Sequence, residues 1–111
     1  RWADISWAVV SEARFNEANL LEADFTEATL VASDFTRANV TRVNFEKANL
    51  IDVRLNGVDL SEALNLTPEQ VESTEFDRAT TFPPYLEVTW EGKDNFKVKK
   101  AIEKKSQTEK N

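Results

Sequence analysis

The residue types that usually carry out chemistry are unevenly represented in this chain. It contains no histidine and no cysteine in 111 residues, which excludes imidazole or thiolate metal sites, disulfides, cysteine nucleophiles and serine–histidine–aspartate triads within it. Carboxylates are plentiful, and pairs such as Glu12 with Asp52, or Asp4 with Asp24, are of the type that a glycosidase or a calcium site uses. We expect them to lie on an exposed convex surface, so the sequence predicts no catalytic residue and no metal ligand.

The composition indicates one small acidic domain. There are 20 acidic and 14 basic residues, a formal net charge of −6, and 41% hydrophobic residues, enough for a core. This charge argues against direct binding to nucleic acid or to an anionic membrane. The only glycines are Gly57 and Gly92, so no glycine-rich phosphate loop is present, and no apolar run approaches the roughly 18 residues of a membrane helix. We therefore predict no cofactor, no small-molecule substrate and no membrane insertion.

The carboxylates sit on a repeat of five residues, and that repeat must position them. Large apolar residues recur at every fifth place, here called the centres: Ile5, Val10, Phe15, Leu20, Phe25, Leu30, Phe35, Val40, Phe45, Leu50, Leu55 and Leu60. At this hydrophobic content the chance of such agreement is on the order of 10⁻⁵. Two places before each centre stands a small or β-branched residue, and the place between them is often Asp or Asn.

Neither a helix nor a long strand explains a period of five. A 3.6-residue helix drifts out of phase, and a strand changes face at every repeat. A chain that turns a corner every five residues buries both the centre and the small residue. Four such units would close one coil, and successive coils would stack at the strand spacing of roughly 4.8 Å.

The repeated segments resemble a known family. Ala18-Asn19-Leu20, Ala23-Asp24-Phe25, Ala38-Asn39-Val40 and Ala48-Asn49-Leu50 are similar to the signature of pentapeptide repeat proteins, and the resemblance runs from about Ala3 to Glu62. It implies an all-β solenoid, a right-handed quadrilateral β-helix of about three coils with four pentapeptides each, over residues 1–66.

Charges twenty residues apart support four units per coil independently of the family. Opposite charges or amides fall into columns at this spacing: Glu17 with Arg37; Glu27 with Lys47; Glu22, Arg42 and Glu62; Arg14, Asp34 and Arg54; Asn19, Asn39 and Asp59. Stacked coils would bring the members of each column together, where they would set the register.

After Leu60 the repeat fades, with Asn65 where a centre should stand, and three further segments are expected beyond residue 66. Thr67-Pro68-Glu69-Gln70 is typical of a helix start with a capping box, so we predict a short capping helix over 67–76 that lays Val71 across the last coil. Residues 77–92 are expected to form an extended segment packed on the side of the solenoid, against Val9, Val31 and Ile51, or else an exposed peptide-like motif. Residues 93–111 form a Lys-rich tail, for which we expect a short helix through Phe96, Val98 and Ile102 and a frayed end, free in solvent or touching an acidic surface.

The function favoured by these observations is that of a non-catalytic scaffold for protein–protein interaction. The chain begins in repeat phase, so we expect a domain or fragment of a longer protein, with a protein partner or a second copy covering the first coil. The candidate interaction surface consists of Trp2, Trp7, Val9, Val31 and Ile51.

The resemblance also implies an alternative function and a location. Some members of the family are acidic mimics of DNA that bind a topoisomerase such as DNA gyrase. That alternative needs a long negative face, whereas the columns here alternate in sign. The distribution of the family implies a cyanobacterial or plastid protein, cytoplasmic or alternatively in the thylakoid lumen.

Overall fold

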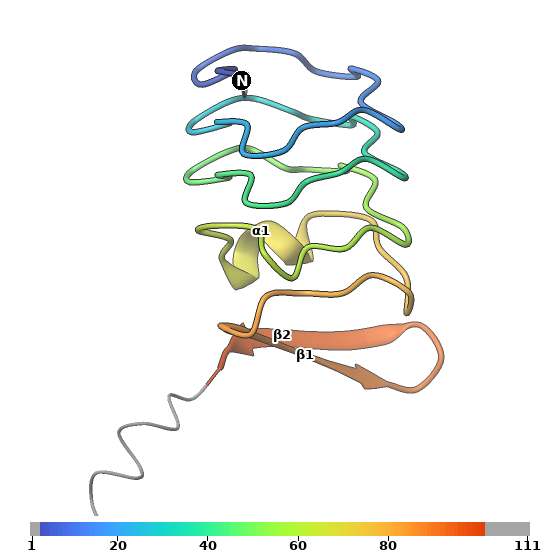
Figure 1. Ribbon diagram of the computed structural model, residues 1–111. Helices are drawn as coiled ribbons and strands as arrows, with labels where there is room; N and C mark the ends of the chain where they lie inside the picture. The colour runs from blue at the N-terminus through green and yellow to red at the C-terminus, as the bar shows by residue number, and fades with distance from the viewer. Residues whose placement is uncertain (1–2, 102–111) are drawn as a thin grey trace, which may run out of the picture.

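The computed structural model describes residues 3–101 and shows a β-helix-like solenoid in which the chain passes over itself about every twenty residues (Figure 1). Parallel bridges join residues at this spacing, for example Asp4 with Asp24 and Asn19 with Asn39. The N–H of Ile5 donates to the carbonyl of Asp24 at 2.8 Å, and the N–H of Asp24 donates to the carbonyl of Ala3 at 2.9 Å. Backbone hydrogen bonds between successive passes therefore hold the stack together, as the five-residue repeat predicts.

The corners of the solenoid explain why the repeat has five residues. The residue two places after each centre from Ile5 to Leu55 lies in the left-handed region, with φ between 54° and 70°: Trp7, Glu12, Glu17, Glu22, Glu27, Ala32, Arg37, Arg42, Lys47, Asp52 and Gly57. The next N–H closes a tight turn onto the centre's carbonyl, as from Ala23 to Leu20 at 2.8 Å. The sequence did not reveal this left-handed position, because glycine occupies it only once.

Where Asp or Asn stands before a centre, it stabilises the same corner. Its side-chain oxygen accepts a hydrogen bond from the N–H two residues on, as Asp24 does from Thr26 at 2.9 Å and Asn39 does from Thr41 at 3.1 Å. These are local turns of the kind that Asp and Asn favour. These Asp and Asn side chains, which in the sequence could be taken for catalytic or metal-binding groups, thus serve to stabilise the backbone turns.

The core runs along the axis of the stack and is formed by the centres. Nine of them are buried: Leu20, Phe25, Leu30, Phe35, Val40, Phe45, Leu50, Leu55 and Leu60. Most of the small inner residues beside them are also buried, including Ser33, whose hydroxyl donates to the carbonyl of Val10 at 3.1 Å. The first three centres, Ile5, Val10 and Phe15, are only half-buried.

The helix α1, Pro68–Glu72, begins as the sequence predicts but is shorter than the expected span 67–76. The capping box is present: the hydroxyl of Thr67 accepts from the N–H of Gln70 at 3.1 Å, and the Gln70 side chain accepts from the N–H of Thr67 at 2.9 Å. Val71 is fully buried. The helix stops early because the hydroxyl of Ser73 donates to the carbonyl of Gln70 at 2.6 Å, and the carbonyl of Ser73 rejoins the ladder.

Residues 77–92 do not pack along the side of the solenoid as expected. After α1 the chain passes under the last repeats: Glu75 exchanges backbone hydrogen bonds with Val53 and Leu55 at 2.8 and 2.7 Å, and Thr81 accepts from Leu60 at 2.8 Å. Tyr85 then donates its hydroxyl to the carbonyl of Ala63 at 2.6 Å. Residues 77–92 pack against the end of the stack rather than its apolar side face because they hydrogen-bond to free backbone groups there. A buried N–H or C=O group without a hydrogen-bond partner is costly.

The expected helix in the Lys-rich region is wrong for the described residues. A hairpin forms instead, from β1, Leu86–Glu91, and β2, Asn95–Lys100, which pair antiparallel with Val88 opposite Val98. Apolar and charged residues alternate with a period of two here, which is typical of a strand, and Gly92 has the positive φ of 88° that the turn requires. Ile102 and the rest of the tail lie outside the described residues.

The hairpin covers the C-terminal end of the stack (Figure 1). An aromatic cluster joins it to the chain below the solenoid, with Phe76 within 5.0, 5.7 and 4.6 Å of the ring centres of Phe82, Trp90 and Phe96. Within residues 3–101 no helix is long and apolar enough to cross a bilayer. One end of the solenoid is thus closed by protein.

Candidate protein-interaction surfaces

The opposite end of the stack is the first coil, defined here as residues 3–22. Its centres Ile5, Val10 and Phe15 are half-buried, whereas Phe25 and Phe35, twenty residues later in two of these columns, are fully buried. Large apolar side chains are thus fully buried in the second pass but partly exposed to solvent in the first. This contrast identifies the outer side of the first coil as an apolar surface.

The candidate residues near this end are strongly exposed. Trp7 is 68% exposed and Val9 is 76% exposed, the largest values among the exposed large hydrophobic residues of the structure. Trp2 lies outside the described residues. Trp7 occupies the left-handed corner, with φ of 64°, where the following four units carry Glu. Its indole therefore points out of the solenoid rather than filling the core.

The first coil also presents an open backbone edge. In the second pass, the N–H groups of Asp24, Thr29 and Asp34 donate to carbonyls of the first coil at 2.8–3.0 Å. Within residues 3–101, the corresponding N–H groups of Asp4 and Val9 take part in none of the backbone hydrogen bonds. This edge combines unpaired donors with the apolar centres beside them, as at the end of any open β-stack.

The side face around Val9, Val31 and Ile51 remains uncovered by the C-terminal segment. Ile51 is 48% exposed and Val31 is half-buried. They belong to repeats twenty residues apart, so they lie one above the other on the flank of the Leu30–Leu50 column. The four candidate residues within residues 3–101 thus divide between one end of the solenoid and one flank.

Ion pairs on the flanks alternate in sign along the stack. Arg42 lies between Glu22 and Glu62, with nitrogen–oxygen distances of 2.6 and 3.2 Å, and Arg37 pairs with Glu17 at 2.9 Å. In the amide column, the Asn39 side chain donates to Asn19 at 3.1 Å. The other columns form differently: among residues 3–101 Glu27 and Lys47 make no ion pair, and Arg54 approaches Glu75 at 3.9 Å rather than Asp34.

Asp34 is held by its own turn. Its carboxylate accepts from the N–H and the hydroxyl of Thr36 at 2.9 and 2.8 Å. These hydrogen bonds, with smaller contributions from the charges of Arg54 and Arg37, hold the pKa of Asp34 below its usual value. The alternating charges and internally bonded carboxylates do not form the continuous acidic stripe that mimicry of DNA needs.

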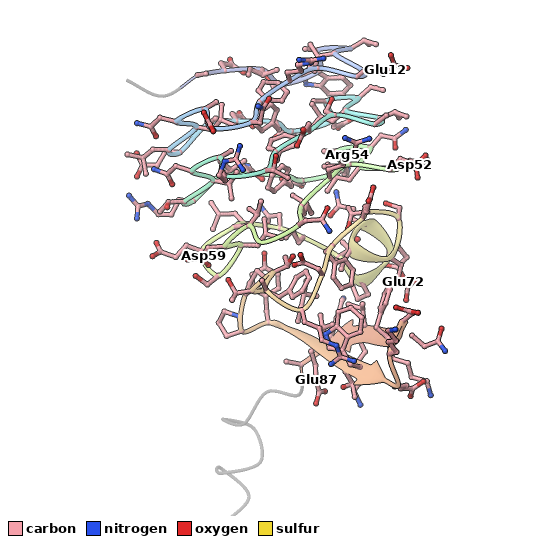
Figure 2. All side chains as sticks on the ribbon, turned by 90° about the vertical axis from the view of Figure 1, so that its right-hand side faces the viewer. Glu12, Asp52, Arg54, Asp59, Glu72 and Glu87 are labelled. Carbon is pink, nitrogen blue, oxygen red and sulfur yellow. The ribbon has the colours of Figure 1, made fainter. Side chains whose placement is uncertain are left out.

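The carboxylate pairs considered in the sequence are not brought together as a site. Asp4 accepts from the N–H and hydroxyl of Ser6 at 3.0 and 2.6 Å, which is again a local turn. Glu12 and Asp52 are exposed and project outward at different levels of the stack (Figure 2). In the described part of the chain no three carboxylates converge as metal ligands would.

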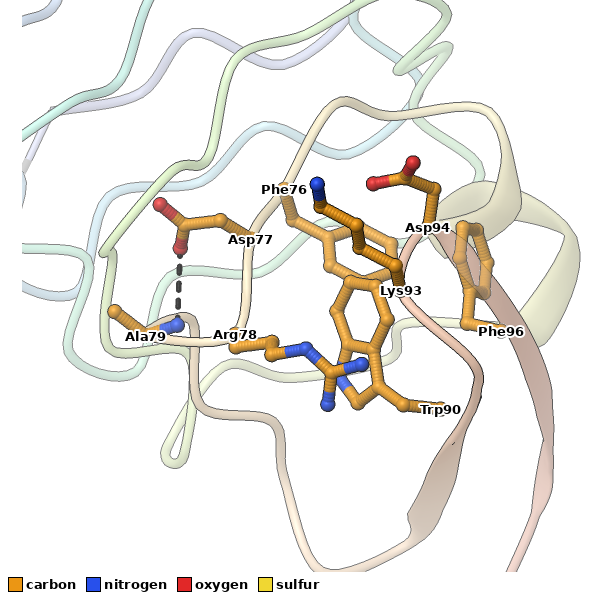
Figure 3. A pocket seen from close by; sticks show the side chains of 8 residues that line it. All are labelled: Phe76, Asp77, Arg78, Ala79, Trp90, Lys93, Asp94 and Phe96. Atoms are coloured by element: carbon orange, nitrogen blue, oxygen red, sulfur yellow. Dashed lines mark hydrogen bonds between the residues drawn. The ribbon is translucent and has the colours of Figure 1, made fainter.

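A groove that the sequence did not predict lies beside the hairpin. It has a volume of about 520 Å³ and is lined by Phe76, Asp77, Arg78, Ala79, Trp90, Lys93, Asp94 and Phe96. The Arg78 guanidinium lies over the Trp90 ring, 4.4 Å from its centre (Figure 3). It also donates a hydrogen bond to the carbonyl of Gly92. The positive charge of Arg78 is thus already used to fasten residues 76–79 to the hairpin.

A family model described as pentapeptide repeats, in 8 copies, matches residues 3–42 and 30–64, more than half of the chain. No curated protein matches the chain.

Proposed function

Because this chain belongs to the pentapeptide repeat family, we propose that it is a non-catalytic scaffold that binds another protein through its first coil. The observation that carries this proposal is the difference in burial between Phe15, half-exposed in the first coil, and Phe35, fully buried beneath it. A surface that has the composition of a core gains most by being covered.

The partner surface that fits best is the end of another repeat stack, and a second copy of this chain is the simplest source. A parallel or antiparallel coil of the same dimensions can pair with the open N–H groups of Asp4 and Val9 and cover Ile5, Val10 and Phe15 at once. A compact partner without such an edge would meet the apolar residues but leave the backbone groups to water. End-to-end association therefore uses both features of the first coil.

Two details of the architecture belong to the same proposal. We infer a right-handed quadrilateral coil with four pentapeptides per turn and about three such coils. The support is the bridge spacing of about twenty residues together with the left-handed corner at every fifth residue from Trp7 to Gly57.

The experiment is a measurement of mass in solution by light scattering over a concentration series, for the wild-type chain and for Trp7→Glu. Glu occupies the equivalent left-handed corner at Glu12, Glu17 and Glu22, so the substitution is compatible with the fold. It would place a charge beside the proposed interface. We expect a wild-type dimer and a Trp7→Glu monomer with unchanged circular dichroism.

The matched control is Ile51→Glu on the side face, which should leave the dimer intact. A dimer broken by Ile51→Glu and not by Trp7→Glu would move the interface from the first coil to the flank. If the wild-type chain stays monomeric up to about 1 mM, its association free energy is weaker than roughly 4 kcal/mol. That result would overturn self-association through the first coil.

A further inference from the structure

Within residues 3–101, the outer strand of the C-terminal hairpin pairs with no third strand, and its side chains define what it would bind. We propose that β1 binds an extended peptide in which Lys or Arg alternates with apolar residues, by adding that peptide as a third strand of the hairpin. This surface lies at the opposite end of the molecule from the first coil, and the proposal does not depend on the proposed function.

The backbone of β1 has hydrogen-bonding groups directed away from β2. The N–H of Ala101 donates to the carbonyl of Tyr85 at 3.0 Å, so these two form a hydrogen-bonded pair. Since such pairs alternate along an antiparallel ladder, Val88 and Trp90 stand in non-hydrogen-bonded pairs and point their N–H and C=O groups outward. Within residues 3–101, no hydrogen bond from outside the hairpin reaches these four groups.

The edge formed by β1 is the accessible one. β2 is the strand that packs near α1, whereas β1 forms the outer border of the hairpin at the end of the molecule (Figure 1). The neighbouring N–H, that of Leu86, already donates to the carbonyl of Pro83 at 3.0 Å. The open stretch therefore runs from Val88 to Glu91.

The side chains of β1 define the charge pattern of the incoming strand. On the solvent face lie the exposed residues Glu87, Thr89 and Glu91, while Val88 and Trp90 are half-buried on the other face. An added strand places one residue opposite each of these in turn. It would therefore present cations opposite Glu87 and Glu91 and apolar side chains beside Val88 and Trp90.

The hairpin already contains one strand with this pattern. On β2, Lys99 lies 3.7 Å from Glu87, and Lys97 lies 3.4 Å from Glu91, both across the strand pair. Phe96 and Val98 fill the apolar face between them. Carboxylates accept from several donors at once, so Glu87 and Glu91 can each meet a second cation on the open side.

The experiment uses the full chain labelled with ¹⁵N and a synthetic peptide with the sequence of residues 95–100, Asn-Phe-Lys-Val-Lys-Lys, acetylated and amidated at its ends. The control peptide, Phe-Val-Asn-Lys-Lys-Lys, has the same composition and the same net charge, but its apolar residues and its lysines are grouped instead of alternating. This control is needed because a protein with net charge −6 attracts any basic peptide. We expect the alternating peptide to bind about tenfold more tightly, and to slow hydrogen exchange at the N–H groups of Val88 and Trp90.

Two substitutions at one exposed position test the charge readout. Thr89→Lys should weaken binding of the alternating peptide about two- to fivefold, and Thr89→Glu should strengthen it by a similar factor, as expected for one exposed ion pair. Asn16→Lys, exposed on the first coil, changes the net charge equally and should leave the affinity unchanged.

Three results would overturn the proposal: equal binding of both peptides, changes that map away from Val88 and Trp90, or equal weakening by Thr89→Lys and Asn16→Lys. The absence of any binding would also overturn it, and would leave the acidic residues of β1 as a device that keeps the edge from pairing.

Discussion

The rings of Phe25 and Phe45 stack almost in parallel, with centres 5.8 Å apart and an angle of 6° between their planes, although twenty residues separate them in the chain. Phe35 meets both rings edge-on, at 5.8 and 6.1 Å. These contacts tie adjacent passes of the solenoid together on its axis. They also give a direct measure of the register between passes.

We expect Phe25→Ala to lower the free energy of unfolding by about 3–5 kcal/mol, because it leaves a cavity among rings that cannot close around it. The measurement is urea unfolding followed by circular dichroism. Leu21→Ala, at a side chain that is 40% exposed, is the control and should cost less than about 1 kcal/mol. A similar small loss for Phe25→Ala would contradict the stacked register.

Gln70 connects the helix to the solenoid, and its substitution by Glu should be destabilising. The side-chain amide donates to the carbonyls of Phe45 and Ala48 at 2.8 and 2.9 Å, while its oxygen completes the capping box with Thr67. Gln70→Glu keeps the oxygen but replaces the donor with a charge, which should cost about 1–3 kcal/mol. Urea unfolding at pH 7 checks this.

The control for that substitution is Glu69→Gln, which changes a charge on the exposed side of the same helix. It should change the unfolding free energy by less than about 0.5 kcal/mol. If Gln70→Glu were as mild, the two carbonyls would be satisfied in another way.

Because of Asp59, the free energy of unfolding should decrease as the pH is lowered. Its carboxylate accepts from the Thr81 hydroxyl at 2.6 Å and from the N–H of Ser61 at 2.9 Å, and hydrogen bonds from Thr81 and then Ser61 hold the pKa of Asp59 below its usual value. The unfolded chain therefore binds the proton first as the pH falls. The stabilisation is complete above the ordinary pKa near 3.8 and is lost below it.

The test compares urea midpoints of the wild-type chain and Asp59→Asn between about pH 2 and pH 6, where aspartate titrates. Asn keeps the acceptor for Thr81 but does not titrate, so the variant should lose less stability on acidification. Glu12→Gln, at an exposed corner, provides the control. Equal acid sensitivity of Asp59→Asn and the wild-type chain would show that the Thr81 contact does not discriminate the charged form.

Gly57 occupies the left-handed corner that other units fill with larger residues. Its φ is 70°, and an added Cβ would meet no atom within 4 Å, so Gly57→Ala tests backbone strain without a clash. We expect a loss of about 1–2 kcal/mol. Ala32→Gly, at the same corner with φ of 63°, should shift stability in the opposite direction. Thermal unfolding of both variants measures the pair, and a gain from Gly57→Ala would contradict the strain.

Part of the candidate site was predictable and part was not. Trp7 and Val9 stand out in the sequence because they break the polar pattern of their positions, and the structure shows them strongly exposed. The aromatic cluster of Phe76, Trp90 and Phe96 was not predicted, since it joins segments with no common period. The hairpin was missed because lysines dominate a stretch whose alternation is short.

The amino-acid sequence is enough to specify the solenoid, because a period of five places a large apolar residue at the same point of every unit from Ile5 to Leu60. Similar local rules act along the repeats: the centre packs toward the core, the next pass stacks on it, and Asp or Asn closes the turn wherever it precedes the centre. Beyond Leu66 no repeat exists. Three contacts could be known only from the folded chain: Gln70 meets the carbonyls of the repeats, Tyr85 reaches Ala63, and a hairpin closes the end. These contacts form because the backbone groups at the end of the stack need hydrogen-bond partners, and those partners come from residues distant in sequence.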